Sequence, residues 1–306
     1  MVTQPKVLLF GASKAGEFFL QQNPELVIKA ILDNDPNRHN TLLCGIPVIS
    51  PEQLPQYSFD QIIITSQWVD AISAQLKQLG VPEHKITVPT KQQVKAALPF
   101  MDPPTLELAH TLLTRLNTFL RQLGIRPCLD SGTLLGAVRQ QALIPWDDDI
   151  DLAIDDAEFA PLRAAMPAFI SQLPAQKELN WQMVLLTVAG QAACINLEFT
   201  PKPGSTLRPF DLSLQRRQLS GEYSELVSSA GLFFAPKQHF SSFDEIRFLG
   251  QDFYIPYDAR GFLTFMYGNW QQPVQGTRIT EYQNRRAQLP PTKMQVKVQK
   301  QLLGEV

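Results

Sequence analysis

The sequence is poor in the residues that mark disulfide scaffolds and zinc sites. Its 306 residues include three cysteines, Cys44, Cys128 and Cys194, which are scattered and form no C-x-x-C pair. This usage indicates free or buried thiols in a reducing compartment. The four histidines are equally scattered, which argues against a zinc site.

Long apolar runs and a strong net charge are also missing. No stretch approaches the roughly eighteen apolar residues of a membrane span, and the short apolar run near the N-terminus is typical of a strand, not of a secretory signal. A net charge of -2 gives no electrostatic footprint for nucleic acid. We therefore expect a cytoplasmic protein with no transmembrane segment and no nucleic-acid partner. No Ser-His-Asp or Cys-His nucleophile is recognisable.

The composition is that of a globular protein with a sizeable core. Hydrophobic residues make up 44% of the chain and charged residues 18%, and the length suits one or two domains. The pattern along the chain favours two, residues 1–92 and 93–306.

The first domain alternates short apolar strands with helical segments. Runs at 6–10, 27–32 and 61–65 are typical of buried strands, and 71–79 has the apolar spacing of a helix. This alternation predicts an α/β domain with a parallel sheet, which resembles a small Rossmann domain.

A glycine turn after the first strand is a candidate ligand loop. Gly11, Ser13 and Gly16 form G-x-S-x-x-G, in which serine replaces the middle glycine that lets a backbone approach a pyrophosphate. Asp33 ends the second strand, where a ribose-binding acid is expected. The LDNDP pattern around it resembles small N-terminal domains of polysaccharide-pathway proteins, some of which bind nucleotide-sugars. The alternative is a tight turn with a docking role.

The most unusual stretch, residues 129–154, combines a glycine-threonine turn, a short apolar helix pattern and an acidic run that leads into a strand. Alternate side chains of a strand share a face. Asp149 and Asp151 are therefore expected on one face, and Ile150 and Leu152 on the other, in the core.

Paired carboxylates need a counter-charge. Two of them a few ångströms apart repel by roughly 1 kcal/mol in water and about 4 kcal/mol at an effective dielectric near 20. Mg²⁺ or Mn²⁺ prefers such hard oxygen ligands, so Asp149 and Asp151 are the expected metal ligands. Asp147 joins their face if the strand starts early. The alternative is a solvated acidic loop, which the alternating apolar residues disfavour.

The turn before this run offers a second half of the site. The turn at Gly132 and Thr133 is expected to open a helix over residues 134–140, and a helix start presents backbone N–H groups to a phosphate. Arg139, further along that helix, is a candidate phosphate partner, with an exposed helix arginine as the alternative.

Two segments, SGTLLGAVR at 131–139 and IPWDDDID at 144–151, resemble the signature of the LicD family. This family includes bacterial phosphocholine transferases, is related to fukutin-type proteins, and belongs to the nucleotidyltransferase superfamily that resembles DNA polymerase β. The resemblance extends over about 119–273 and is thinner at the closing segment, where Asn269 replaces a common Asp. It implies an α+β nucleotidyltransferase-like second domain.

The resemblance also implies a third carboxylate on a later strand. Glu198 is the preferred candidate, because its place between Leu197 and Phe199 in the predicted hairpin 181–199 fits the superfamily's third carboxylate. Asp211 is the rival, because this chain lacks the family's usual Asp-x-Phe-Pro segment. Either carboxylate can share the metal or accept a proton from an acceptor hydroxyl.

The function that the resemblance implies is transfer of a substituted phosphate, such as phosphocholine, from a CDP-linked donor to a glycan hydroxyl. The setting would be cell-surface polysaccharide or lipopolysaccharide biosynthesis, with peripheral contact to a membrane-linked glycan. One alternative is nucleotidyl transfer from a nucleoside triphosphate. Another is a binding or assembly module with a silent site.

Two further segments have weak patterns. Residues 202–221 are rich in Pro, Gly, Ser and Arg and are expected to be a loop with mostly solvated arginines. The tail at 290–306 suggests at most a short basic helix.

Overall fold

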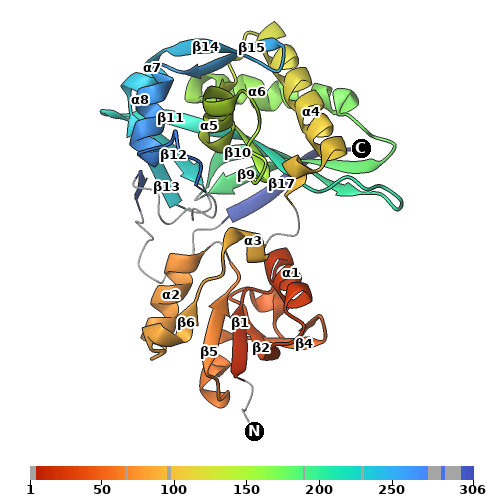
Figure 1. The fold of residues 1–306 in the computed structure, drawn as a ribbon, viewed down its shortest axis with the longest axis vertical. Coiled ribbons are helices and arrows are strands. Elements are labelled where there is room, and N and C mark those ends of the chain that lie inside the picture. The colour runs from red at the N-terminus through yellow and green to blue at the C-terminus, as the bar shows by residue number, and fades with distance from the viewer. Residues whose placement is uncertain are drawn as a thin grey trace. The chain divides into compact units, whose positions relative to one another are not determined.

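The computed structural model describes residues 5–66, 68–94, 98–188, 190–228, 231–274, 284–286 and 298–306. The chain divides into two compact units, of which the first is mainly Met1–Ala96 and the second contains Ala97–Gln275 and the C-terminal strand. Both units combine helices with a sheet that contains parallel strands (Figure 1). The chain is therefore a mixed α/β protein, as the sequence predicts for its first part.

The first unit is built on a six-stranded sheet of order β3-β4-β2-β1-β5-β6. Its described pairings are parallel except that of β3 with β4. The strands are β1 (Lys6–Phe10), β2 (Val27–Leu32), β3 (Leu42–Leu43), β4 (Ile46–Ile49), β5 (Gln61–Ile64) and β6 (Ile86–Thr87), and the helices are α1 (Lys14–Gln22), α2 (Val69–Gln78) and α3 (Lys91–Val94).

Helices cover both faces of this sheet. Leu8 of β1 packs in a cluster with Ile72 and Leu76 of α2, while Val7 packs with Phe19 of α1 on the opposite face. Because both faces are covered, the strands read as continuous apolar runs, as is usual for parallel sheets.

The second unit is built on an eleven-stranded mixed sheet. Its main path is β14-β15-β7-β8-β11-β10-β9-β17, and β12, β13 and β16 continue from β11. The helices are α4 (Pro103–Gln122), α5 (Ser131–Gln140), α6 (Asp156–Phe169), α7 (Gln238–Ser241) and α8 (Ala259–Tyr267). The strands are β7 (Cys128–Leu129), β8 (Asp149–Asp155), β9 (Leu179–Val188), β10 (Gln191–Pro201), β11 (Asp211–Ser220), β12 (Tyr223–Ser228), β13 (Gly231–Pro236), β14 (Phe243–Phe248), β15 (Gln251–Pro256), β16 (Arg285–Arg286) and β17 (Val298–Glu305).

One large apolar cluster holds this unit together. Ile150 and Leu152 of β8 are fully buried, and they share the cluster with the apolar residues of α4 and α6. The centre of the sheet is thereby fixed from its apolar side, which leaves the other side of β8 for polar residues.

The loop prediction for residues 202–221 is confirmed for 202–210 and wrong for Asp211–Ser220, because β11 occupies the centre of the sheet between β8 and β10. The segment reads DLSLQRRQLS, with Leu212 and Leu214 fully buried. Its period-two pattern is masked by the paired arginines and by the Pro- and Gly-rich residues before it. Arg217, expected in solvent, is 4% exposed.

The helix prediction for the tail is also wrong over the residues that the structure describes there. Val298–Glu305 forms β17, which runs antiparallel to β9 at the edge of the sheet. Its polar residues face solvent while pairing with β9 supplies the hydrogen bonds, so the apolar periodicity of the strand is weak.

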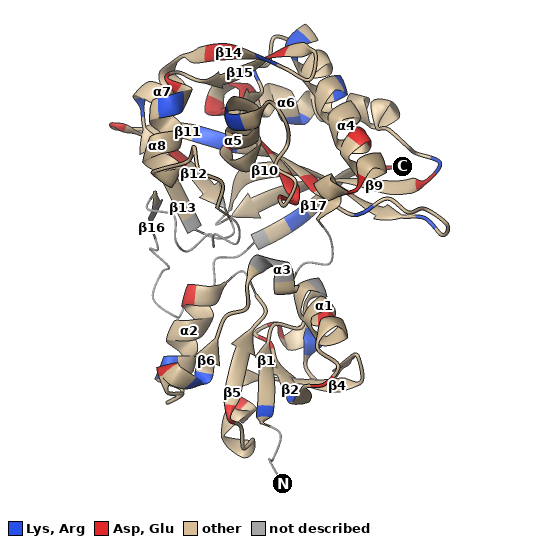
Figure 2. Cartoon of the chain, in the orientation of Figure 1, with Lys and Arg blue, Asp and Glu red and all other residues tan. Residues whose placement is uncertain are grey.

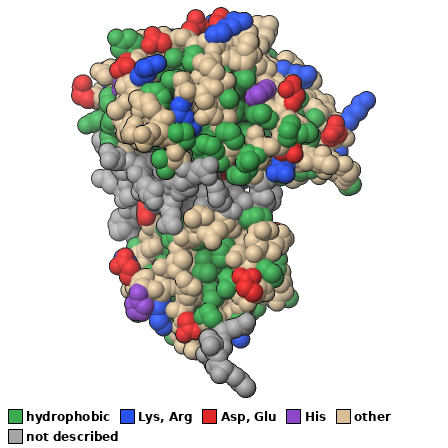
Figure 3. Space-filling model, in the orientation of Figure 1, with side chains coloured by type: hydrophobic (Ala, Val, Ile, Leu, Met, Phe, Trp, Pro, Cys, Tyr) green, Lys and Arg blue, Asp and Glu red, His purple; other side chains and the backbone are tan. Residues whose placement is uncertain are grey.

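Charged residues of both signs are spread over both units (Figure 2), and the face drawn in Figure 3 mixes acidic, basic and apolar side chains. Among the described helices, none is long and apolar enough to cross a bilayer.

Gly16 is predicted to be essential for the packing of the first unit. A Cβ at this position would lie 2.2 Å from the carbonyl oxygen of Gly11. Gly16→Ala should therefore destabilise the chain by about 1–3 kcal/mol, measured by urea unfolding. Ala15→Ser, which adds one atom at the neighbouring half-buried position, is the control, and an equal loss in both variants would contradict this account.

Candidate active site

Three neighbouring strands bring carboxylates to one face of the second sheet. Asp149 of β8 lies opposite Asp211 of β11 in a parallel pairing, and Asp211 lies opposite Glu198 of β10 in an antiparallel one. Adjacent strands are about 4.8 Å apart. The three acids therefore form a row across the sheet, with the buried Ile150 and Leu212 turned to its other side.

The next row on this face is polar as well. It contains Asp151, Ser213 and Asn196. The Asp151 carboxylate accepts a 2.6 Å hydrogen bond from the amide of Gln215, and the Ser213 hydroxyl donates to Asn196 Oδ1 at 3.1 Å. Asp149 and Asp151 thus share a face, as their spacing predicts, and Asp151 is held by a defined partner.

The glycine-threonine turn lies directly against these acids. α5 begins at Ser131, three residues earlier than expected, so Gly132 and Thr133 are in its first turn. The Thr133 hydroxyl accepts from the backbone N–H of Asp151 at 2.9 Å. A Cβ at Gly132 would lie 2.1 Å from Asp147 Oδ2, so glycine is required for this close approach.

The turn keeps donors available. The first N–H groups of a helix have no partner within the helix, and no hydrogen bond among the described residues uses the N–H of Gly132 or Thr133. An anion placed there would meet these donors and the positive end of the helix dipole.

Burial and neighbouring charge raise the pKa of the Asp151 carboxyl well above its usual value. Burial is the largest cause, followed by the charges of Asp149, Asp130, Asp147 and Asp211. The face therefore concentrates negative charge that a bound cation would offset. Glu198 is not among these causes.

Asp147, Asp148 and Asp149 form a second grouping of ligand atoms, all within 4.8 Å of one another. The Asp147 carboxylate also accepts from the N–H of Asp148 at 3.2 Å. The acidic run therefore curves so that consecutive carboxylates meet, which a strand beginning at Asp149 allows and an earlier strand start would not.

The Glu198 carboxylate already has a cationic partner on β17. Its carboxylate lies 3.5 Å from the Lys300 ammonium of β17, and its side chain is 37% exposed. Asp211 lies next to Asp149 and contributes to the charge around Asp151. The geometry therefore favours Asp211 over Glu198 as the third carboxylate.

Arg139 lies in the last turn of α5, away from the turn that carries Gly132. Its guanidinium donates to the side chain of Gln140 at 3.1 Å and to the carbonyl oxygen of Trp270 at 3.4 Å. Burial lowers its pKa. In this structure it joins α5 to Trp270, and among the described residues its hydrogen bonds go to Gln140 and Trp270, not to the acids.

The candidate loop of the first unit is occupied by its own side chains. The Asp33 carboxylate accepts from the N–H of Ala12 at 2.7 Å and from that of Asp35 at 2.8 Å, and Arg38 donates to the carbonyl oxygen of Ala12. Gly11 has φ of +124°, which favours glycine, and Ser13 is the N-cap of α1 without a side-chain cap bond.

Sequence reasoning missed the ion pair between Asp130 and Arg217. Asp130 is the N-cap of α5, and its carboxylate lies 2.8 Å from Arg217 Nη2. Asp130 immediately precedes the SGT turn, which is a signal for a cap. Arg217 offered no such signal, because its strand was predicted to be a loop.

Cys194 lies on the same face as Asn196, and its thiol donates to Asn196 Oδ1 at 2.8 Å. Burial raises the pKa of this thiol, and nearby Asp151 adds to the effect. The thiol is therefore protonated at neutral pH and is a poor nucleophile.

Comparison with known families matches both units. Residues 124–258 match the family model described as LicD/FKTN/FKRP, nucleotidyltransferase domain, and residues 3–87 match C2185-like, N-terminal. The first match includes the turn at Gly132, the acidic run and Asp211.

Two curated proteins are similar over a short stretch. They are the uncharacterized protein RP689 of Rickettsia prowazekii, 43% identical, and the uncharacterized protein RT0683 of Rickettsia typhi, 42% identical, each over 60 residues. These stretches are 20% of this chain and 20% and 17% of the relatives, so the match spans about a fifth of their length.

Solved structures give distant matches. A UDP-D-quinovosamine 4-dehydrogenase from Vibrio fischeri is 21% identical over 28% of this chain and 76% of that chain. A UDP-N-acetylglucosamine 3-dehydrogenase, GnnA, from Acidithiobacillus ferrooxidans is 10% identical over 89% of this chain and 91% of that chain. Both have a TM-score of 0.23, which decides nothing about the fold.

The family assignment therefore rests on the second unit, where the matched residues and the acid-lined turn coincide. Residues 124–258 of the chain therefore match the LicD family, a phosphotransferase-type family.

Proposed function

We propose that this chain is a divalent-metal-dependent phosphotransferase that moves a substituted phosphate from a CDP-linked donor to a glycan hydroxyl. The observation that carries the proposal is the convergence of Asp149, Asp151 and Asp211 on one sheet face, beside the Gly132–Thr133 turn. The second unit then has the nucleotidyltransferase-like organisation that its family match implies.

The donor set fits a divalent cation. Asp149 and Asp151 supply hard carboxylate oxygens on adjacent positions of one face, and burial among other acids raises the pKa of Asp151. Mg²⁺ or Mn²⁺ would supply neutralisation of the donor's phosphate charge when bound. Asp147 and Asp211 are within reach as further ligands.

The turn and the third carboxylate have complementary tasks. The first N–H groups of α5 hold the donor's phosphate oxygens, while the Thr133 hydroxyl fixes the position of Asp151. Asp211, or Glu198 after release from Lys300, accepts the proton of the attacking hydroxyl. Positioning and charge neutralisation are the main requirements of phosphoryl transfer.

Nucleotidyl transfer is the second candidate, since the same acids and turn suit a nucleoside triphosphate. The released product separates the two reactions. Transfer of the substituted phosphate releases CMP from a CDP-linked donor, whereas nucleotidyl transfer releases pyrophosphate from a nucleoside triphosphate. A silent assembly module releases neither.

Removing either central acid is expected to abolish transfer with the fold intact. In a mass-spectrometric screen of CDP-linked and nucleoside triphosphate donors with Mg²⁺, Asp149→Asn and Asp151→Asn should lower turnover by at least about a hundredfold. Asp155→Asn is the matched control. It lies on the same strand and face, and asparagine can still accept the N–H of Ala157. Turnover of the first two variants within a fewfold of the control would refute the assignment.

The pH dependence of stability offers a test without turnover. Because the pKa of Asp151 is raised in the folded chain, folding takes up a proton above the usual value of 3.8. The free energy of unfolding of the metal-free protein should therefore fall as pH rises from 3.8 to the raised pKa of Asp151. It should stay lower at neutral pH.

At pH 7.5 we expect Mg²⁺ to raise the melting temperature of the unaltered chain. Asp151→Asn should raise the melting temperature of the metal-free protein. The same substitution should remove most of the increase that Mg²⁺ gives. For a unit of this size each kcal/mol corresponds to about 2–4 °C. A lower melting temperature of metal-free Asp151→Asn, with an undiminished response to Mg²⁺, would contradict the role of this carboxylate.

For the first unit we propose weak binding of a nucleotide or nucleotide-sugar at the turn of Gly11, Ser13 and Gly16. Binding would require Asp33 to exchange the N–H of Ala12 for a ribose hydroxyl. A nucleotide-dependent rise in melting temperature that Ser13→Trp abolishes, but Ser66→Ala retains, is the expected result. No shift with any UDP-, CDP- or ADP-linked compound would leave this unit with a docking role.

A further inference from the structure

Asp130, which precedes the glycine-threonine turn, forms a buried ion pair with Arg217. Asp130 is fully buried and Arg217 is 4% exposed. Two guanidinium nitrogens of Arg217, Nε and Nη2, both lie 2.8 Å from Asp130 Oδ2. A buried charge that loses its partner is strongly unfavourable, so the two side chains depend on each other.

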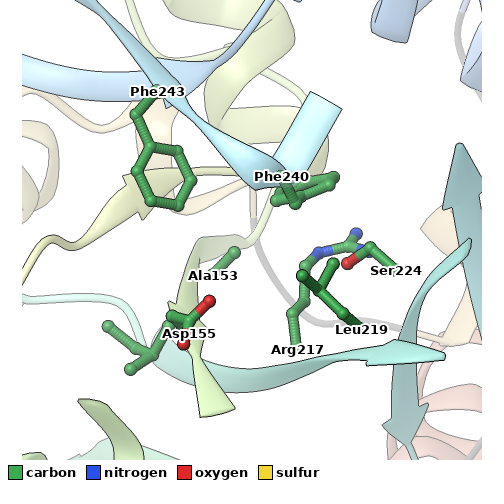
Figure 4. A pocket seen from close by; sticks show the side chains of 8 residues that line it. Ala153, Asp155, Arg217, Leu219, Ser224, Phe240 and Phe243 are labelled. Carbon is green, nitrogen blue, oxygen red and sulfur yellow. The ribbon is translucent and has the colours of Figure 1, made fainter. Parts of the chain in front are cut away.

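Arg217 is held in one orientation by aromatic rings. Its guanidinium carbon lies 4.1 Å from the centre of the Phe240 ring and 5.9 Å from that of Phe262. Figure 4 shows Arg217 and Ser224 side by side in the wall of a small pocket. Arg217 Nη1 has no hydrogen-bond partner among the described residues, so the hydrogen bonds of the guanidinium are those to Asp130.

Asp130 in turn holds both the turn and the metal-site strand. Its carboxylate accepts the N–H of Ser131 at 2.7 Å, and its carbonyl oxygen accepts that of Leu134 at 3.0 Å. Its own N–H donates to the carbonyl oxygen of Asp151 at 3.1 Å. Ser131 has φ of +50°, a strained conformation for serine that the Asp130 carboxylate supports.

We propose that Arg217 is a positioning residue: it fixes Asp130, and through Asp130 it sets the Gly132–Thr133 turn against Asp149 and Asp151. Among the described residues the guanidinium hydrogen-bonds to Asp130, and to neither Asp149, Asp151 nor the Gly132–Thr133 turn. Its effect on turnover rests on the proposed function, whereas its effect on the geometry of the turn does not. The two consequences can therefore be measured separately.

The geometric consequence is tested by amide hydrogen exchange at Ser131, Leu134 and Asp151 in the full chain. Arg217→Met should lower protection at these amides by about tenfold or more relative to Arg216→Met. Arg216 is a matched control on the same strand, paired with Asp156 on α6 and not with the turn. Arg217→Lys, which keeps the charge but loses the forked geometry, should fall between Arg217→Met and the control.

Unchanged protection at all three amides in folded Arg217→Met would overturn the proposal. If that variant fails to fold, the double variant Asp130→Asn with Arg217→Met removes both buried charges and is measured instead. Loss of protection in the double variant supports the proposal, and retained protection overturns it.

The catalytic consequence is measured with the donor that the screen identifies, well below each variant's melting temperature. Arg217→Met should lower kcat at least about tenfold and raise KM for the donor, because the turn that holds the phosphate is displaced. Arg216→Met should change neither more than about twofold. Absence of transfer by the unaltered chain refutes the proposed function alone, since the exchange measurement still decides the role of Arg217.

Discussion

The second unit depends on the mutual repulsion of carboxylates that are held together on one face of a sheet. Asp149, Asp151 and Asp211 occupy neighbouring positions there, and Asp130 and Asp147 add to the charge around Asp151. Such a group does not assemble by attraction. The apolar residues on the opposite face, Ile150 and Leu152 among them, fix the strands and so force the acids into proximity. A site of this kind is ready for a cation because the core, and not the cation, arranges its ligands.

Two features of the structure reduce the electrostatic repulsion between these carboxylates. Arg217 balances the charge of Asp130, the most buried of the acids. The N-terminal turn of α5 lies against Asp147 and Asp151, where the helix dipole is positive. The same two features also hold the Gly132–Thr133 turn in position. Electrostatic compensation and the positioning of a phosphate-binding turn are therefore two effects of one structure, which explains why glycine is needed at position 132.

The sequence predicted the half of the site whose signals are local. The alternation around Asp149, Asp151 and Ile150 is readable from a few residues, and so is the turn at Gly132, although α5 begins earlier than expected. The other half comes from β11, whose position between β8 and β10 is a matter of long-range pairing. Two paired arginines hid its strand periodicity, and one of them is buried only because Asp130 lies opposite. No local pattern contains that information.

The two glycine turns of the chain also show why chemistry is assigned to the second unit. At the first turn Asp33 already accepts the N–H of Ala12, and Arg38 binds the carbonyl oxygen of the same residue. A phosphate would have to displace a carboxylate there. At the second turn the buried acid, Asp130, accepts the N–H of Ser131, and the Thr133 hydroxyl accepts that of Asp151. Helix starts that look alike in sequence thus differ in which of their backbone N–H groups an internal carboxylate has taken.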